Sequence, residues 1–154
     1  MRASEAERAF RRALALDPES TKARVGLAQA FMIHTVVDSA TAVLETALEK
    51  DPGSAEAAYT LACVYRATGD LGREVDLLGR AVSADPAYSL AQDRLGDIHL
   101  AAGRDAEAVA AFKAALLGRT QVQHVHGKLA NAYHAMGDTD AAKNRLDLDR
   151  DVAL

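Results

Sequence analysis

Five histidines and one cysteine are the first residues of this 154-residue chain to consider as ligands for a metal ion or as a nucleophile. His124 and His126 are two residues apart, so on a helix their side chains point about 200° apart. His124 and His134 share a helix face but lie ~15 Å apart along it. Because zinc holds its ligands at about 2.0–2.1 Å, neither pair can share one ion. We therefore expect no metal site and no cofactor.

Nucleophilic and phosphate chemistry finds equally little support in the sequence. A reactive thiol needs neighbouring positive charge, and Cys63 has only Arg66 nearby, so a small apolar contact is its favoured role. Gly127-Lys128 lacks the upstream glycine of a phosphate loop, because Val122 stands there. No Ser-His-Asp order, zinc-protease motif or glycine-rich nucleotide turn occurs. The sequence predicts a protein that is not an enzyme.

Composition and charge exclude further classes of function. Apolar residues make up 49% of the chain and the formal net charge is −4, which is typical of a globular protein. No run of Lys or Arg stands out, so nucleic acid and anionic membranes are poor candidates for partners. Residues 1–10 contain no apolar signal core, and no stretch approaches the ~18 apolar residues of a membrane span. With its single cysteine the chain forms no internal disulfide, and we expect it in the cytoplasm.

The elements that would position these residues form a repeated unit, which the spacing of several residue types reveals. Proline occurs only at Pro18, Pro52 and Pro86, which are 34 residues apart, and Thr120 stands where a fourth would fall. Several other series keep the same period: Ala6, Ala40, Ala108 and Ala142; Phe10, Leu44, Leu78, Phe112 and Leu146; Leu27, Leu61, Leu95 and Leu129; Ala28, Ala62, Gly96 and Ala130; Phe31, Tyr65, His99 and Tyr133; Gly69, Gly103 and Gly137. A fixed period of this size predicts a stack of helical units.

Within this period the sequence predicts nine helical segments. They span residues 3–16, then 21–34 with 37–50, 55–68 with 71–84, 89–102 with 105–117, and 123–136 with 139–149. Proline ends a helix because it lacks an N–H donor and clashes with the preceding turn. Ser20 and Ser54 are expected to cap the helices that follow. Glycines at 69, 103 and 137 supply the left-handed residue that ends the first helix of a pair, and the Asp that follows is expected to cap the next helix.

This combination of residues resembles the tetratricopeptide repeat family, whose unit is a 34-residue helix-turn-helix. The resemblance covers nearly the whole chain. It implies an all-α fold, a right-handed superhelix or α-solenoid of antiparallel helix pairs, forming one domain. Residues 1–20 are then the second helix of an incomplete repeat. Residues 21–54, 55–88 and 89–122 are repeats 1 to 3, and 123–154 form a fourth repeat with a polar C-terminal end.

Two positions break the pattern inside this array. The turn of the first pair carries His34-Thr35 instead of glycine, and we expect it to take another path, because a β-branched residue is disfavoured in a left-handed conformation. Glu74 stands where its counterparts are alanine, and we expect its carboxylate to reach water or to pair with Arg66 or Arg73.

Apolar residues also crowd the first turn. They are Phe31, Met32, Ile33, Val36 and Val37. One interpretation is that they fill the seam against the first helix. The other is an exposed apolar lip that holds a partner.

The resemblance further implies a concave groove, lined by the first helix of each pair, in which a peptide or a partner helix lies. The candidate binding residues are Val25, Gln29, Met32, Ile33, Tyr59, Cys63, Arg66, Asp93, Asp97, Leu100, Asn131 and His134. Asp93 and Asp97 are one helical turn apart, where like charges are mildly destabilising. The simplest interpretation is that both carboxylates lie on a helix face exposed to water. Our hypothesis is that they meet a basic residue of a bound protein or peptide.

These expectations favour a non-catalytic interaction module that binds a partner segment so that a complex can assemble. A self-associating scaffold is the second interpretation, because residues 3–16 lack a preceding helix and a second copy could cover the bare face. The third is a regulatory module cut from a larger protein, which would explain a chain that begins within a repeat.

Overall fold

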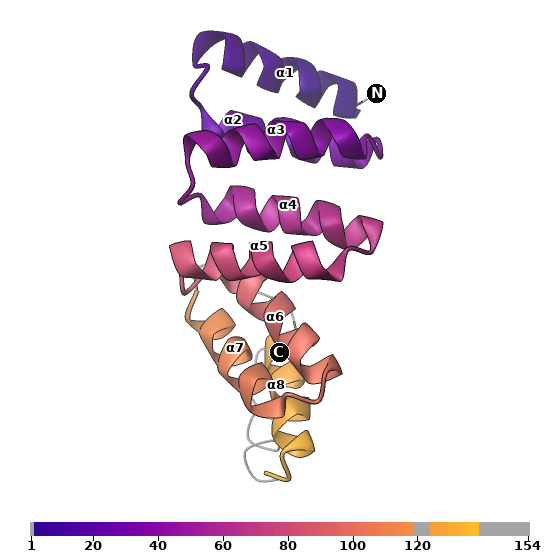
Figure 1. Ribbon diagram of the computed structural model, residues 1–154, viewed down its shortest axis with the longest axis vertical. Helices are drawn as coiled ribbons and strands as arrows, with labels where there is room; N and C mark the ends of the chain where they lie inside the picture. Colours follow the sequence, from indigo (N-terminus) through magenta and orange to yellow (C-terminus); the bar gives the residue numbers. More distant parts are fainter. Residues whose placement is uncertain (1, 119–123, 139–154) are drawn as a thin grey trace, which may run out of the picture. The chain divides into compact units, whose positions relative to one another are not determined.

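In the computed structural model, residues 2–118 and 124–138 are described, and every element of secondary structure within them is a helix. The helices are α1 (Arg2–Leu16), α2 (Thr21–Ile33), α3 (Val37–Lys50), α4 (Ala55–Thr68), α5 (Leu71–Ala84), α6 (Ser89–Ala101), α7 (Asp105–Leu117) and α8 (Val125–Ala135), as Figure 1 shows. Eight predicted segments are therefore confirmed to within two residues at each end. The ninth, at 139–149, lies outside the described residues, as does the polar C-terminal end. Within the described ranges, none of the helices combines the length and the apolar content of a membrane span.

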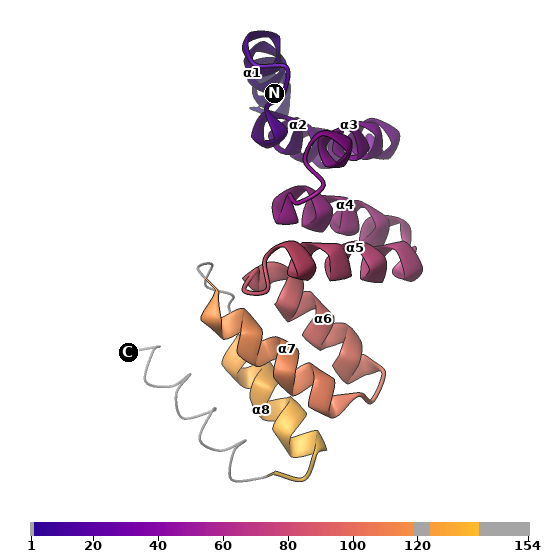
Figure 2. The same ribbon diagram turned by 60° about the vertical axis from the view of Figure 1, so that its left-hand side comes forward.

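The chain divides into two compact units, Met1–Ala84 (unit 1) and Asp85–Leu154 (unit 2), with the boundary beside Pro86. In unit 1, each of the helices α1 to α4 packs on the helix that follows it, and α2 also contacts α4 (Figure 1). In unit 2, α7 packs against both α6 and α8, and α6 also contacts α8 (Figure 2). First helices of successive pairs are thus neighbours within each unit. The single domain expected from the sequence stays a prediction.

Side-chain caps begin three of the helices. Ser20 and Ser54 each accept a hydrogen bond from the backbone N–H three residues on, at 3.3 and 3.2 Å. Asp70 accepts one in the same way at 3.0 Å, ahead of α5. These bonds satisfy N–H groups that have no partner inside the helix, and they confirm the predicted caps. The prediction is wrong for Asp105, because Asp105 is the first residue of α7 itself and the cap position before it is held by Arg104, whose side chain makes no cap.

The turns inside the helix pairs share one backbone geometry. Gly69, Gly103 and Gly137 have positive φ angles of 80°, 69° and 81°, and Thr35, which holds the equivalent place in the first pair, has a φ of 59°. In all four turns the left-handed residue donates to the carbonyl three residues back, and the next residue donates to the carbonyl five residues back. The prediction that the His34-Thr35 turn takes another path is therefore wrong. The two hydrogen bonds satisfy carbonyls at the end of α2 and offset a left-handed cost of about 1–2 kcal/mol.

Small residues allow the helices to approach closely. Ala28 and Ala40 in unit 1 are fully buried, as is Ala108 in unit 2. Gly96 of α6 lies against the ring of Phe112, and a Cβ atom added there would come within 2.5 Å of that ring. The close crossing of α6 and α7 therefore depends on glycine.

Glu74 occupies the alanine position of α5 and is only 3% exposed. The prediction that its carboxylate reaches water is wrong, because the side chain is covered by its neighbours. The alternative of an ion pair with Arg66 or Arg73 stays a prediction.

Candidate functional site

The first helices of unit 1 bring together six of the predicted binding residues. We call this set the unit 1 face: Gln29, Met32 and Ile33 of α2, with Tyr59, Cys63 and Arg66 of α4. Spacings of three and four residues keep each set on one side of its helix, and α2 and α4 are in contact. Gln29, Ile33 and Arg66 are exposed, whereas Tyr59 and Cys63 are half-buried.

Val25 does not belong to this face. Its side chain is 1% exposed, so the prediction that it meets a ligand is wrong. Helix α2 is covered by α1, α3 and α4, and this covering leaves little of its surface open. Sequence spacing places Val25 one turn before Gln29 but does not show which of the two is covered.

The apolar residues at the end of α2 divide between the two interpretations. Phe31 is 8% exposed and has the guanidinium of Arg11 at 5.9 Å from its ring centre, so it fills the seam with α1. Ile33 and Val36 are 71% and 42% exposed, so they form an apolar lip beside the left-handed Thr35. Such a lip offers a ligand apolar contact without a further change in the fold.

In unit 2, the two predicted acidic residues meet a lysine of their own chain. Lys128 of α8 places its Nζ 2.8 Å from both oxygens of Asp93 and 2.9 Å from Oδ2 of Asp97, both on α6. We call these three residues the acid–lysine cluster. The side chains of Asp93, Lys128 and Asp97 are 15%, 29% and 35% exposed, so the cluster stays within reach of a ligand.

The charges of the cluster hold the lysine in its protonated form. Burial disfavours the ammonium of Lys128, but the hydrogen bonds and charges of Asp93 and Asp97 outweigh burial, so the pKa of Lys128 is raised. The Nζ atom also lies 5.9 Å from the centre of the Phe112 ring. With two carboxylates and one ammonium, the cluster keeps a net charge of −1.

Sequence reasoning missed Lys128 as a site residue. The residue follows Asp97 by 31 positions and Asp93 by 35, which is close to one repeat period. Since first helices of neighbouring pairs touch, pairs separated by about one period are the ones to examine. That rule, applied to opposite charges, would have found the cluster.

The remaining predicted residues of unit 2 differ in exposure. Asn131 and His134 are exposed on α8. Leu100 is half-buried and packs with Tyr133 against the core cluster around Phe112, so much of its surface serves the fold.

The groups considered for metal binding and catalysis remain dispersed in the described ranges. No group of three or more His, Cys, Asp or Glu side chains there could hold a metal ion. His99 is half-buried and accepts a hydrogen bond at Nδ1 from Nε of Arg104, at 3.0 Å. Cys63 is a half-buried free thiol.

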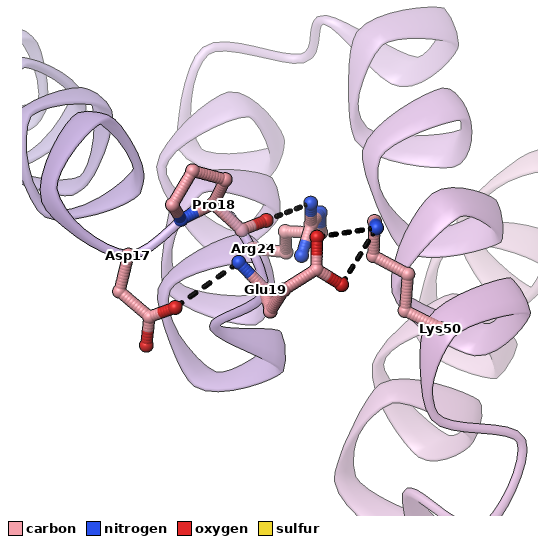
Figure 3. A network of polar contacts seen from close by, with 5 residues as sticks. All are labelled: Asp17, Pro18, Glu19, Arg24 and Lys50. Carbon is pink, nitrogen blue, oxygen red and sulfur yellow. Dashed lines mark hydrogen bonds and ion pairs between the residues drawn. The ribbon is translucent and has the colours of Figure 1, made fainter.

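A polar network fixes the loop before α2, and Figure 3 shows its members. Asp17 accepts the N–H of Glu19 at 3.1 Å, Arg24 donates to the carbonyl of Pro18, and Lys50 contacts both carboxylate oxygens of Glu19 at 2.7 Å. The hydrogen bonds from Lys50 lower the pKa of Glu19. The network links the loop before α2 to the end of α3.

Two family profiles match the sequence, and both describe a tetratricopeptide repeat. One matches residues 2–34 and 75–121, which is more than half of the chain, and the other matches residues 43–75. No protein of curated function matches the sequence at a significant level.

Solved structures share the fold at low sequence identity. A crystal structure of MamA is 23% identical, covers 98% of this chain and 91% of its own, and has a TM-score of 0.75. TTC0263, a thermophilic TPR protein in Thermus thermophilus, is 23% identical over 96% of this chain and 81% of its own, with a TM-score of 0.69. A chain of the APC/C hetero-tetramer Cut9-Hcn1 is 23% identical over 96% of this chain and 29% of its own, with a TM-score of 0.71. These likenesses establish an all-α solenoid of helix pairs.

Proposed function

Because the chain belongs to the tetratricopeptide repeat family, whose repeats are generally non-catalytic modules for protein–protein interaction, we propose that each unit binds a segment of a partner protein on the face formed by its first helices. The Cut9-Hcn1 hetero-tetramer supports this proposal, since a chain of the same fold is part of an assembly of proteins there. Both units have a surface formed by two neighbouring first helices, α2 with α4 in unit 1 and α6 with α8 in unit 2.

The acid–lysine cluster is the observation that carries the proposal. Lys128 holds the carboxylates of Asp93 and Asp97 in fixed positions, so little side-chain entropy is lost when a ligand docks. The remaining charge of −1 favours a ligand with a lysine or arginine, which would bring the site to neutrality. On the unit 1 face, Tyr59 and Ile33 favour apolar side chains of the ligand.

The test begins with short random peptides displayed on phage and selected against the whole chain. We expect the selected peptides to be enriched in Lys and Arg. A variant carrying both Asp93→Asn and Asp97→Asn should bind the synthesised peptides about tenfold more weakly, because each charge-assisted hydrogen bond is lost while the side-chain shape is kept. Lys128→Gln should bind them more tightly, since it raises the negative charge of the cluster.

Glu107→Gln is the matched control, because Glu107 is an exposed carboxylate on α7 outside the first-helix face. It should leave the affinity unchanged. Equal affinity of the selected peptides for the wild type and for the double Asp variant would reject the role of the cluster, and equal affinity for a variant with Tyr59→Ala would reject the unit 1 face.

Self-association is a second candidate, which the exposure of α1 favours. Leu16 is 88% exposed, and Leu14 is only half-buried. A second copy of the chain could cover these side chains. Light scattering across a wide dilution series tests this candidate, and a mass that stays monomeric at the highest concentration would remove it.

A further inference from the structure

Unit 1 carries a cleft between α3 and α5, which are the second helices of their pairs. Two adjoining hollows of about 430 and 350 Å³ share Glu45, Tyr65 and Arg73, so they form one continuous cleft, which we call the α3–α5 cleft. None of the residues of the unit 1 face lines it. A ligand in this cleft would therefore use different contacts from a ligand on the unit 1 face.

The floor of the α3–α5 cleft is apolar and firmly packed. Leu48, Leu61 and Leu77 line it and are 4–6% exposed. Tyr65 lies where the two hollows join, and the guanidinium of Arg73 is 5.0 Å from its ring centre. Arg73 also pairs with Asp70 at 3.2 Å, so this cation is already engaged by its own unit. The floor offers a shallow apolar surface with a fixed aromatic ring at its centre.

The rim of the cleft is acidic. Its lining includes five carboxylates but only two guanidinium groups: Asp38, Glu45, Glu49, Asp70 and Asp76, with Arg73 and Arg80. The resulting net charge is −3. All of the charged lining residues that α3 contributes are acidic, so the negative charge is concentrated along that helix. A low-dielectric floor beneath such a rim strengthens its attraction for cations.

Glu45 and Glu49 stand one helical turn apart on α3, which is the spacing of Asp93 and Asp97 on α6. In unit 2 a lysine ammonium lies 2.8–2.9 Å from both carboxylates. In the described part of the chain, no salt bridge reaches Glu45 or Glu49. Arg73 is a cation that Glu45 affects: its pKa is raised mainly by the hydrogen bond with Tyr65 and less by the charges of Asp70 and Glu45. Both are exposed, so a cation from outside can approach them. The protein thus contains the same acidic pair twice, once with its lysine and once without.

We propose that the α3–α5 cleft is a second interaction surface, which binds a partner segment carrying a lysine or arginine on Glu45 and Glu49 and an apolar side chain against Tyr65 and Leu77. The complementarity of charge selects the basic residue, and the apolar floor selects its neighbour. The protein would then hold two partners, or two segments of one partner, at the same time.

The probe is a short synthetic peptide, blocked at both ends, with a central leucine flanked by lysines, and the matched peptide has glutamate in place of each lysine. Titration is followed by ¹H–¹⁵N NMR spectra of the whole chain. We expect the lysine peptide to shift the amide signals of Leu48, Tyr65 and Leu77, and the shifts to weaken with added salt. The glutamate peptide should shift none of them.

Variants locate the site. Glu45→Gln with Glu49→Gln should weaken binding of the lysine peptide at these signals about fivefold, since exposed charge pairs contribute modestly. The same signals should respond as in the wild type when Asp93→Asn and Asp97→Asn are introduced instead. Shifts confined to α6 and α8, shifts with both peptides, or an unchanged affinity in the Glu variant would each overturn the proposal. The first of these results would leave the first-helix face intact, so the two proposals fail separately.

Discussion

Equivalent positions on the first helices of the two units carry different side chains. Tyr59 and Cys63 of α4 are followed, one period later, by Asp93 and Asp97 of α6. In unit 1 these positions are neutral and half-buried. In unit 2 they are acidic and bridged by Lys128. The backbone of the helix pair is the same in both units, so the difference lies in what each face can recognise.

The side chains at buried positions differ far less between the two units than those at the surface positions. Ala62 of α4 corresponds to Gly96 of α6, and both are buried at helix crossings. Where two helices cross, close packing admits only small side chains, whereas a surface position admits side chains of many sizes. A repeat array can therefore change its ligand without changing its fold. The comparison of the two units also predicts which substitutions lower the free energy of unfolding most.

The largest expected effect comes from the two glycines that receive an aromatic ring. Gly96 lies against Phe112, which is fully buried, whereas Gly26 lies against Phe10, which is half-buried. Gly96→Ala should lower the free energy of unfolding by about 1–3 kcal/mol, because the ring of Phe112 has no room to move. Gly26→Ala should cost less, because Phe10 can turn towards solvent. Urea denaturation of both variants checks this order, and equal losses would contradict it.

The second comparison concerns the left-handed turns. Thr35 in unit 1 and Gly103 in unit 2 have the same role, but only threonine bears the cost of a Cβ atom at positive φ. Thr35→Gly should raise the free energy of unfolding by about 0.5–1 kcal/mol, the left-handed cost reduced by the greater freedom of glycine in the unfolded chain. Gly103→Ala should lower it by about 1 kcal/mol.

Thermal unfolding measures both turn variants. A neutral Thr35→Gly would show that the hydrogen bond from Thr35 Oγ1 to the carbonyl of His34, at 2.6 Å, compensates for the strain. A stabilised variant that bound selected peptides less well would show instead that the strained turn holds the apolar lip of Ile33 and Val36 in place.

The residues behind these comparisons also show how far the sequence predicts the structure. Helix ends followed from Pro18 and Gly69, because both act on the chain within a few residues. The left-handed conformation of Thr35 does not follow from its steric cost alone, because the turn supplies two hydrogen bonds that offset this cost. Burial of Val25 could not be predicted, since it depends on three helices that cover α2 at once. Whether a residue belongs to the candidate site depends on its exposure and on contacts between residues far apart in the sequence. The sequence therefore predicts less of the site than of the fold.

The last comparison sets two lysine contacts against each other. Lys128 in unit 2 bridges two carboxylates and is partly buried, whereas Lys50 in unit 1 pairs with Glu19, whose side chain is 70% exposed. Lys128→Met should lower the free energy of unfolding by roughly 0.5–1 kcal/mol at neutral pH, after allowance for its exposure to solvent. Lys50→Met should leave stability unchanged within error at physiological salt, because an exposed pair is screened.

The pH dependence distinguishes a charge effect from a packing effect at Lys128. The pKa of Lys128 is raised above its ordinary value of 10.5, so its contribution is fully present below that pH and is lost as the pH rises through the raised pKa. The difference between the wild type and Lys128→Met should therefore be constant from neutral pH to about pH 10 and shrink above it. Urea denaturation at a series of pH values measures the difference. A gap that persists at the highest pH would assign the effect to packing of the uncharged part of the lysine side chain and not to its charge, and the two units would then differ less in their electrostatics than the bridging contacts indicate.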